Sequence, residues 1–233
     1  GLDKTNFKIV KVPEIDAKKS IHNTNSTFTI DSTNLSLNGT HNISLTGYEK
    51  LEFLYKFNRK KEQDLGFLQL ALKYGTEKTQ FNNIEYKNTH REQPTIHISF
   101  STNTRSRIRK IDNELYVKPN LDYSLKSEII KNEAKEFDKG VDYKFEKHFT
   151  TKLLIPEYYS VKDLPKPVHF ENDLFNFKIS YNYLEEEQQI IIEKKISVNT
   201  LRVKPTDTEE WNNFITSLMK VNKHNIVLKM NTK

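Results

Sequence analysis

The chain is most informative between residues 28 and 45, where it reads Phe28-Thr29-Ile30-Asp31-Ser32-Thr33-Asn34-Leu35-Ser36-Leu37-Asn38-Gly39-Thr40-His41-Asn42-Ile43-Ser44-Leu45. Apolar side chains alternate with polar ones on both sides of Asn38-Gly39, a pattern that predicts half-buried β-strands. Asn-Gly is the strongest two-residue hairpin signal, because type I′ turns need positive φ at both central residues. This stretch therefore predicts a β-hairpin with its turn at Asn38-Gly39.

Working outward, the same alternation predicts strands at residues 81–86, 96–100, 107–118, 143–155, 174–183, 188–198 and 226–228. Helical spacing interrupts it in three places. The first predicted helix covers residues 48–58, after Gly47, and the second covers residues 62–74, with Gly75 as its C-terminal cap. The third carries Trp211, Phe214 and Leu218 on one apolar stripe, which predicts that Trp211 lies in the core.

These elements predict a mainly β, α+β fold. We expect two domains, with a boundary before Pro94. Residues 1–90 would form a β-hairpin and helical-pair domain, and residues 91–233 a β-sandwich-like domain with a C-terminal helix packed against it.

The composition of the chain argues against several classes of function. The chain has 233 residues, a net charge of +6 and no cysteine. Only six of its 37 basic residues are arginine, and the acidic residues are interleaved with the lysines, so nucleic-acid binding is not predicted. No apolar run is long enough to span a membrane. Residues 1–30 lack a signal-peptide core, so any export signal is expected upstream.

Catalytic and cofactor motifs are absent from the sequence. Without cysteine there is no thiol nucleophile or Cys-ligated metal, and the six glycines do not form a phosphate-binding loop. No GxSxG elbow occurs. The seven histidines, at positions 22, 41, 90, 97, 148, 169 and 224, lack metal-site spacing and are expected at the surface or rim. The sequence predicts no catalytic residue, no metal site and no cofactor.

One charged arrangement is a candidate site. Arg105, Arg107 and Arg109 would share one face of an extended strand. They could bind an anion such as an acidic glycan or a phosphate, or they could form a solvated strand edge that discourages aggregation. The sequence favours the solvated edge.

Several segments together resemble a known family. Residues 153–161, Leu-Leu-Ile-Pro-Glu-Tyr-Tyr-Ser-Val, followed by Leu-Pro-Lys-Pro at 164–167, are similar to a signature near the C-terminus of bacterial multidomain transglutaminase-like proteins. Residues 172–181, the Trp-Asn-Asn-Phe-Ile at 211–215 and the Ile-Val-Leu-Lys at 226–229 fit the same tail. Upstream, residues 37–40 and 45–48 resemble the start of the region after the catalytic core, and residues 113–117 resemble a middle segment.

The resemblance implies a C-terminal, non-catalytic β region of unknown function. In such proteins a papain-like core with a Cys–His–Asp triad precedes this region, so the core is expected upstream of residue 1. It also implies export to the periplasm or cell surface. No catalytic residue is carried over, because this chain has no cysteine.

Three functions follow as hypotheses. The first is an accessory or scaffolding region whose partner is its own transglutaminase-like core or another protein. The second is a glycan- or anion-binding β module. The third, a hydrolase, would require a histidine and carboxylates that converge in a cleft.

Overall fold

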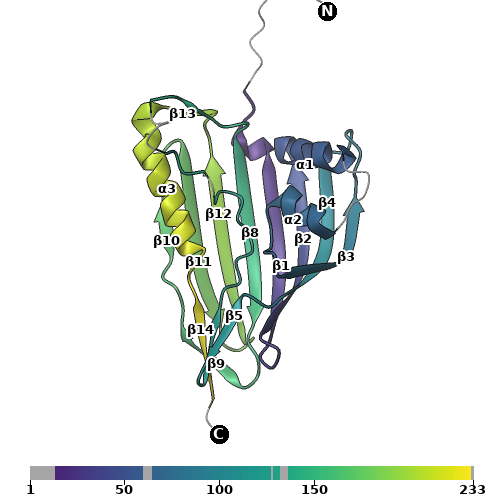
Figure 1. Cartoon of the computed structure of the whole chain (residues 1–233), viewed down its shortest axis with the longest axis vertical. Coiled ribbons are helices and arrows are strands. Elements are labelled where there is room, and N and C mark those ends of the chain that lie inside the picture. The colour runs from purple at the N-terminus through teal and green to yellow at the C-terminus, as the bar shows by residue number, and fades with distance from the viewer. Residues whose placement is uncertain (1–13, 60–64, 127, 132–135, 232–233) are drawn as a thin grey trace, which may run out of the picture.

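The computed structural model describes residues 14–59, 65–126, 128–131 and 136–231. Its main element is an eight-stranded mixed sheet (Figure 1). In spatial order the strands are β10 (Val168–Phe170), β11 (Phe175–Leu184), β12 (Gln189–Val198), β8 (Phe145–Leu154), β1 (Ile21–Asp31), β2 (Ser36–Thr46), β4 (Thr95–Thr104) and β3 (Thr79–Lys87). Neighbouring strands are antiparallel except β1 and β8, which are parallel at the centre of the sheet.

Two smaller sheets accompany it. The four-stranded sheet has the order β5 (Ile108–Ile111), β6 (Glu114–Val117), β14 (Ile226–Met230) and β9 (Tyr159–Asp163), and the two-stranded sheet pairs β13 (Arg202–Val203) with β7 (Lys139–Gly140). The helices are α1 (Gly47–Arg59), α2 (Leu65–Leu72) and α3 (Thr208–Val221), with short 3-10 helices η1 (Ala17–Lys19) and η3 (Pro205–Asp207). With 47% strand and 19% helix, the predicted mainly β class is confirmed.

The three α-helices and the four-stranded sheet lie over the same face of the large sheet (Figure 1). The predicted helical pair and C-terminal helix are confirmed, and Trp211 is buried as expected. Residues 62–64 of the second predicted helix lie outside the described residues, and α2 ends at Leu72, so Gly75 is not its cap. Gly47 connects β2 directly to α1. Its φ is +53°, and a Cβ there would lie 2.1 Å from the carbonyl oxygen of Lys19, so only glycine allows this abrupt change from strand to helix.

The predicted hairpin exists, but its turn is not at Asn38-Gly39. The chain turns at residues 32–35, where the Asp31 carboxylate accepts hydrogen bonds from the amides of Thr33 and Asn34. Asn38 and Gly39 lie inside β2. Gly39 pairs with Phe28, and a Cβ would lie 2.6 Å from that ring, so this glycine provides space for an aromatic side chain rather than a turn.

Other boundaries differ in detail. The strand expected at residues 107–118 is two strands, β5 and β6, joined by a turn. The connection at residues 88–94 joins β3 to β4, and these strands pair with each other; the predicted division into two domains at this connection stays a prediction. A β-sandwich is not confirmed, because the strands after residue 91 contribute to the large mixed sheet as well as to the small ones.

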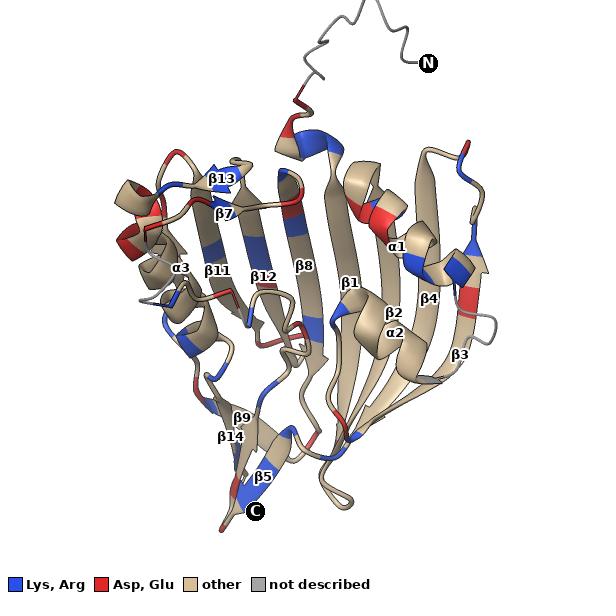
Figure 2. Cartoon of the chain, turned by 45° about the horizontal axis from the view of Figure 1, so that its top comes forward, with Lys and Arg blue, Asp and Glu red and all other residues tan. Residues whose placement is uncertain are grey.

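The number of charged side chains on the outer face of the large sheet differs between its two sides. Among the described residues of β1, β2 and β4, only Asp31, at the end of β1, is charged, and Figure 2 shows these strands otherwise free of charge colours. The outward positions of the three strands carry Asn, Ser, Thr and His, whereas β8, β11 and β12 carry lysines and glutamates. No helix among the described residues is long and apolar enough to cross a membrane.

Candidate functional site

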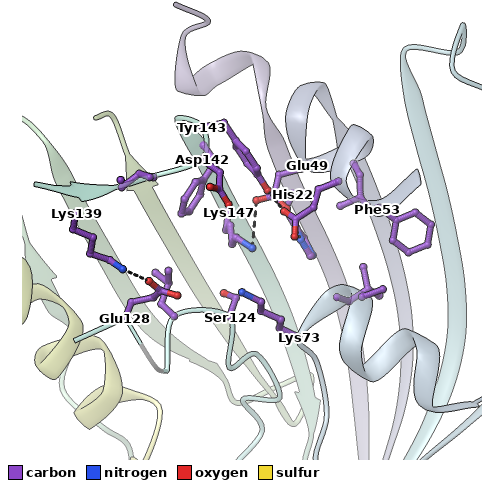
Figure 3. Close-up of a pocket in the computed structure, with 18 of the residues that line it drawn as sticks. His22, Glu49, Phe53, Lys73, Ser124, Glu128, Lys139, Asp142, Tyr143 and Lys147 are labelled. Atoms are coloured by element: carbon purple, nitrogen blue, oxygen red, sulfur yellow. Dashed lines mark hydrogen bonds and ion pairs between the residues drawn. The ribbon is translucent and has the colours of Figure 1, made fainter. Parts of the chain in front are cut away.

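A cavity of about 290 Å³ lies between the large sheet, the helices α1 and α2, and the segments around residues 124–128 and 139–143 (Figure 3). Its lining mixes charged and apolar side chains. The charged residues are Glu49, Glu52, Lys73, Glu128, Lys139, Asp142 and Lys147, together with His22. The apolar wall includes Leu45, Phe53, Leu72, Val141, Phe145 and Trp211.

The floor of the cavity is a buried cluster of charged and polar side chains from three elements. The parallel register of β1 and β8 places His22 directly beside Lys147. The first turn of α1 brings Glu49 over both, with Oε2 3.5 Å from His22 Nδ1 and Oε1 3.3 Å from Lys147 Nζ. Each of the three residues is less than 10% exposed. Glu49 thus bridges the two central strands of the sheet.

The electrostatics of this cluster favour the ionised carboxylate. Burial alone would raise the pKa of Glu49, but the charge of Lys147 and the hydrogen bond and charge of His22 outweigh it and lower the pKa to about 2. Burial lowers the pKa of Lys147, yet Glu49 and Asp122 reverse the direction, so its pKa is raised. The cluster therefore holds a carboxylate and an ammonium in a largely desolvated place.

The upper wall is held by Tyr143 and Glu52. Tyr143 donates a short hydrogen bond to Glu52, which also pairs with Lys56 one turn along α1. Burial, Glu49 and Glu52 raise the pKa of Tyr143, so this hydroxyl stays protonated and acts as a donor.

The side near α3 is fixed by Glu128. Its carboxylate pairs with Lys139 at 2.8 Å, and its carbonyl oxygen accepts a hydrogen bond of 2.6 Å from the indole of Trp211. The segment around Glu128 is thus tied both to β7 and to α3, which closes the cavity on this side.

Among the described residues that line the cavity, Ser124 has a hydroxyl group without a hydrogen-bond partner. The residue is 6% exposed, and its amide donates to Asp122 Oδ1 at 3.1 Å. Its Oγ makes no hydrogen bond with any described residue. Figure 3 shows the Ser124 side chain and the end of Lys73 directed into the same part of the cavity. Buried hydroxyls are usually satisfied, so this one is open to a ligand or water.

A second buried pair lies on the neighbouring strand. Lys194 of β12 is 3.0 Å from Asp122 Oδ2 and 4.3 Å from the centre of the Phe149 ring. Burial would raise the pKa of Asp122, but the charges of Lys194 and Lys147, with hydrogen bonding by Lys194, lower it to about 2. The charge of Lys147 thus acts on the carboxylates of both ion pairs, Glu49 and Asp122.

The expectation that the histidines lie at the surface or rim is wrong for two of them. His22 is 3% exposed and His41 is 1% exposed. His41 Nδ1 lies 2.8 Å from Ser26 Oγ and its Nε2 lies 2.8 Å from Thr102 Oγ1. Burial lowers the pKa of His41 to about 3, so its imidazole is a neutral core group.

The three predicted arginines are not aligned on one strand. Arg105 and Arg107 lie in the connection between β4 and β5, and only Arg109 lies in a strand. Arg105 and Arg109 are exposed. Arg107 is partly buried beside Glu77 in a separate cavity, and burial lowers its pKa. The arginines therefore do not form the stripe that alternation suggested, and anion binding by them stays a prediction.

The charged floor of the cavity was not predicted from the sequence, although the alternation of residues in the strands indicates it. Lys147 lies at an inward position between Phe145 and Phe149, and Lys194 lies between Ile192 and Ile196 in the same way. A lysine in the apolar register of a strand predicts a buried charge that needs a partner. The partners themselves come from distant segments, so they could not be assigned from the sequence.

Chemically, the cavity offers charge and hydrogen bonding. Its carboxylates and ammonium groups largely pair with each other, and among the described residues Ser124 Oγ has no histidine bonded to it that would act as a base. No group of three or more described His, Asp or Glu side chains is placed to hold a metal ion. Charged groups, hydrogen-bond donors and acceptors, and an apolar wall are thus what the described lining offers to a ligand.

Residues 113–228 match a family described as Domain of Unknown Function with solved-structure structure, DUF3858. The matched segment runs from the turn before β6 into β14. No curated protein matches the chain. The cavity combines Ser124, Lys147 and Trp211 from the matched part with His22 and Glu49 from the part before it.

Proposed function

We propose that this chain is a non-catalytic binding region of a larger exported protein, with the cavity beneath α1 and α2 as its binding site. The resemblance to transglutaminase-like proteins suggests that a catalytic core precedes it, outside the cell or in the periplasm. The region would then position a ligand or scaffold its own core or another protein. It would not carry out the chemistry itself.

The observation that carries this proposal is the pairing inside the cavity. Glu49 pairs with Lys147, and Glu128 pairs with Lys139. Charged groups that neutralise each other in a partly enclosed space cost desolvation energy and bring no nucleophile, but they give a specific pattern of charge for recognition. Such a pattern suits binding better than turnover.

The test uses the parent protein in three forms: intact, without this region, and with Gly140→Phe. Gly140 lines the cavity and is exposed, and a Cβ there would meet no atom within 4 Å, so this position has room for a larger side chain at the edge of the cavity. Asn213→Phe, on the exposed side of α3, is the matched control. We expect removal and Gly140→Phe to reduce the activity of the parent or its affinity for its partner, and the control to leave both unchanged.

If neither removal nor obstruction changes activity or partner binding, the proposal is wrong. Turnover of any substrate by the isolated chain, abolished by a single substitution in the cavity, would contradict its non-catalytic part.

A second candidate is binding of a neutral glycan on the outer face of β1, β2 and β4. Asn25, Asn42 and Ser99 are cross-strand neighbours there, beside a shallow hollow that His97 and Lys87 also line. Asparagine, serine and threonine hydrogen-bond both ways without charge, which complements an uncharged, hydroxyl-rich ligand. Affinity electrophoresis in neutral polysaccharides tests it. Asn42→Ala should abolish any retardation, whereas Lys178→Ala on β11 should not.

A further inference from the structure

We infer that the cavity binds a small zwitterion, a molecule that carries one carboxylate and one ammonium group, of which a free amino acid is the simplest member. This inference deepens the proposed binding function and rests on it. It concerns which chemical class the cavity selects, and four features of the lining carry it.

The first feature is size. A cavity of about 290 Å³ has room for about ten water molecules, which corresponds to an amino acid or a very short peptide. Whole polysaccharide chains and folded proteins are too large to be enclosed by it, so a large partner could insert only a short segment. Phe53, Leu72 and Val141 line part of the cavity and offer an apolar place for an aliphatic side chain.

The second feature is the balance of unpaired charge. Glu49 and Glu128 are paired with lysines inside the cavity, and Glu52 is paired with Lys56. Of the remaining charged side chains of the lining, Lys73 and Asp142 have no ion pair with any described residue. One positive and one negative group therefore remain for a ligand. A ligand with a single charge would leave one of them without a counterpart.

The third feature is a place for the carboxylate. Ser124 Oγ is buried without a partner in the described structure, and Figure 3 shows Lys73 reaching the same space. Lys147 Nζ contacts one oxygen of Glu49, which leaves further N–H groups available at the floor. A hydroxyl and two ammonium groups that line the same cavity can provide charge-assisted hydrogen bonds for a carboxylate.

The fourth feature is a place for the ammonium group. Asp142 lies across the cavity from Ser124 and Lys73, next to Tyr143 (Figure 3). Glu49 faces the same cavity and uses each oxygen for one contact, so both oxygens can accept another hydrogen bond. The positive end of the ligand would thus lie toward Glu49 and Asp142.

The test is calorimetric titration of the full 233-residue chain with three matched probes. L-leucine carries both charges, N-acetyl-L-leucine only the carboxylate, and L-leucinamide only the ammonium. Glycine, L-alanine and L-phenylalanine vary the side chain. We expect at least one free amino acid to bind, and each of its singly charged forms to bind at least tenfold more weakly, roughly the loss of one charge-assisted hydrogen bond.

Variants assign the two ends of the ligand. Ser124→Ala and Lys73→Gln should weaken the amino acid and the N-acetyl form while leaving the amide form unchanged, and Asp142→Asn should weaken the amino acid and the amide form. Lys73 and Asp142 are exposed at the rim, so these substitutions should not disturb folding. Lys220→Gln, on the exposed side of α3, is the control and should change none of the affinities.

The inference is overturned if a singly charged form binds as well as the zwitterion, or if no amino acid of the panel binds up to about 10 mM. Its failure is distinct from failure of the proposed function. If the amino acids do not bind but Gly140→Phe still impairs the parent protein, the binding region remains and only the zwitterion is wrong.

Discussion

The inner face of the large sheet is packed in two contrasting ways. Beneath α3, Phe170, Phe175 and Phe177 of the sheet meet Trp211 and Phe214 of the helix, with ring centroids 5.3 to 6.3 Å apart. Beneath α1 and α2 the same sheet presents ion pairs and a cavity. The aromatic half gains stability from burial, whereas the charged half gives up some of that stability for a site.

The largest predicted effect lies in the aromatic half. Phe214 is fully buried and contacts the rings of four aromatic neighbours, so Phe214→Ala should lower the free energy of unfolding by about 3–5 kcal/mol. Urea denaturation measures it. Phe137→Ala is the control, because Phe137 is 70% exposed and its loss should cost at most about 0.5 kcal/mol. A loss below about 1 kcal/mol for Phe214→Ala would mean that this half is loosely packed.

In the charged half the informative change breaks one ion pair. Lys147→Met should cost about 3 kcal/mol, because it leaves the buried carboxylate of Glu49 with only His22 as a partner. Adding Glu49→Gln should recover most of this loss, since the unpaired charge is then gone. If the two substitutions are additive in urea denaturation, the residues are not coupled and the contrast between the halves is smaller than proposed.

A third prediction concerns the pH dependence of the free energy of unfolding, which follows from the buried titratable groups. His41 is neutral in the folded protein, with its pKa lowered by burial from 6.5 to about 3. Above pH 6.5 the imidazole of His41 is neutral in both the folded and the unfolded state, so this residue does not lower the free energy of unfolding. Between pH 6.5 and about 3 only the unfolded state binds the proton, so stability should fall by about 1.4 kcal/mol per pH unit from this residue.

The carboxylates act in a lower window. Glu49 and Asp122 have pKa values lowered to about 2, from 4.5 and 3.8, so their contributions persist above those ordinary values and are lost as the pH falls toward 2. Denaturation midpoints measured from pH 7 to 5 thus isolate His41. His41→Gln should flatten the pH dependence there, and His97→Gln, on the exposed outer face, should not.

The two halves also differ in how far the sequence predicts them. The stripe of Trp211, Phe214 and Leu218 is a local pattern, and both the helix and its buried face are where that pattern placed them. The charged floor joins His22, Glu49 and Lys147, which are far apart in the chain. Their proximity follows from the parallel pairing of β1 with β8, and no local pattern encodes a pairing over that separation.

Two local signals were also ambiguous in themselves. Asn38-Gly39 is typical of a turn, but here the glycine is required by the ring of Phe28 across the strand pair. Arg105, Arg107 and Arg109 alternate as in a strand, but the chain turns between β4 and β5. In both cases a contact or turn from outside the pattern decides the outcome.

The smallest predicted effect tests the inner face of β1, where polar and apolar positions adjoin. Its inward positions change from polar at Thr24 and Ser26 to apolar at Phe28, and Gly39 of β2 lies under that ring. A Cβ at Gly39 would lie 2.5 Å from His41 Nε2 and 2.6 Å from Phe28, so Gly39→Ala must displace one of them. We expect a loss of about 1–2 kcal/mol in urea denaturation, as for overpacking of a core.

Gly140→Ala provides the matched comparison, since its Cβ would meet no atom within 4 Å and its cost should be close to zero. A neutral Gly39→Ala would show that the backbone of β2 moves away easily, and that this part of the core tolerates more volume than the packing suggests. A loss well above about 3 kcal/mol would instead show that displacement of His41 breaks its hydrogen bonds with Ser26 and Thr102. The size of this one effect therefore measures how tightly the polar network is held where it adjoins the apolar core.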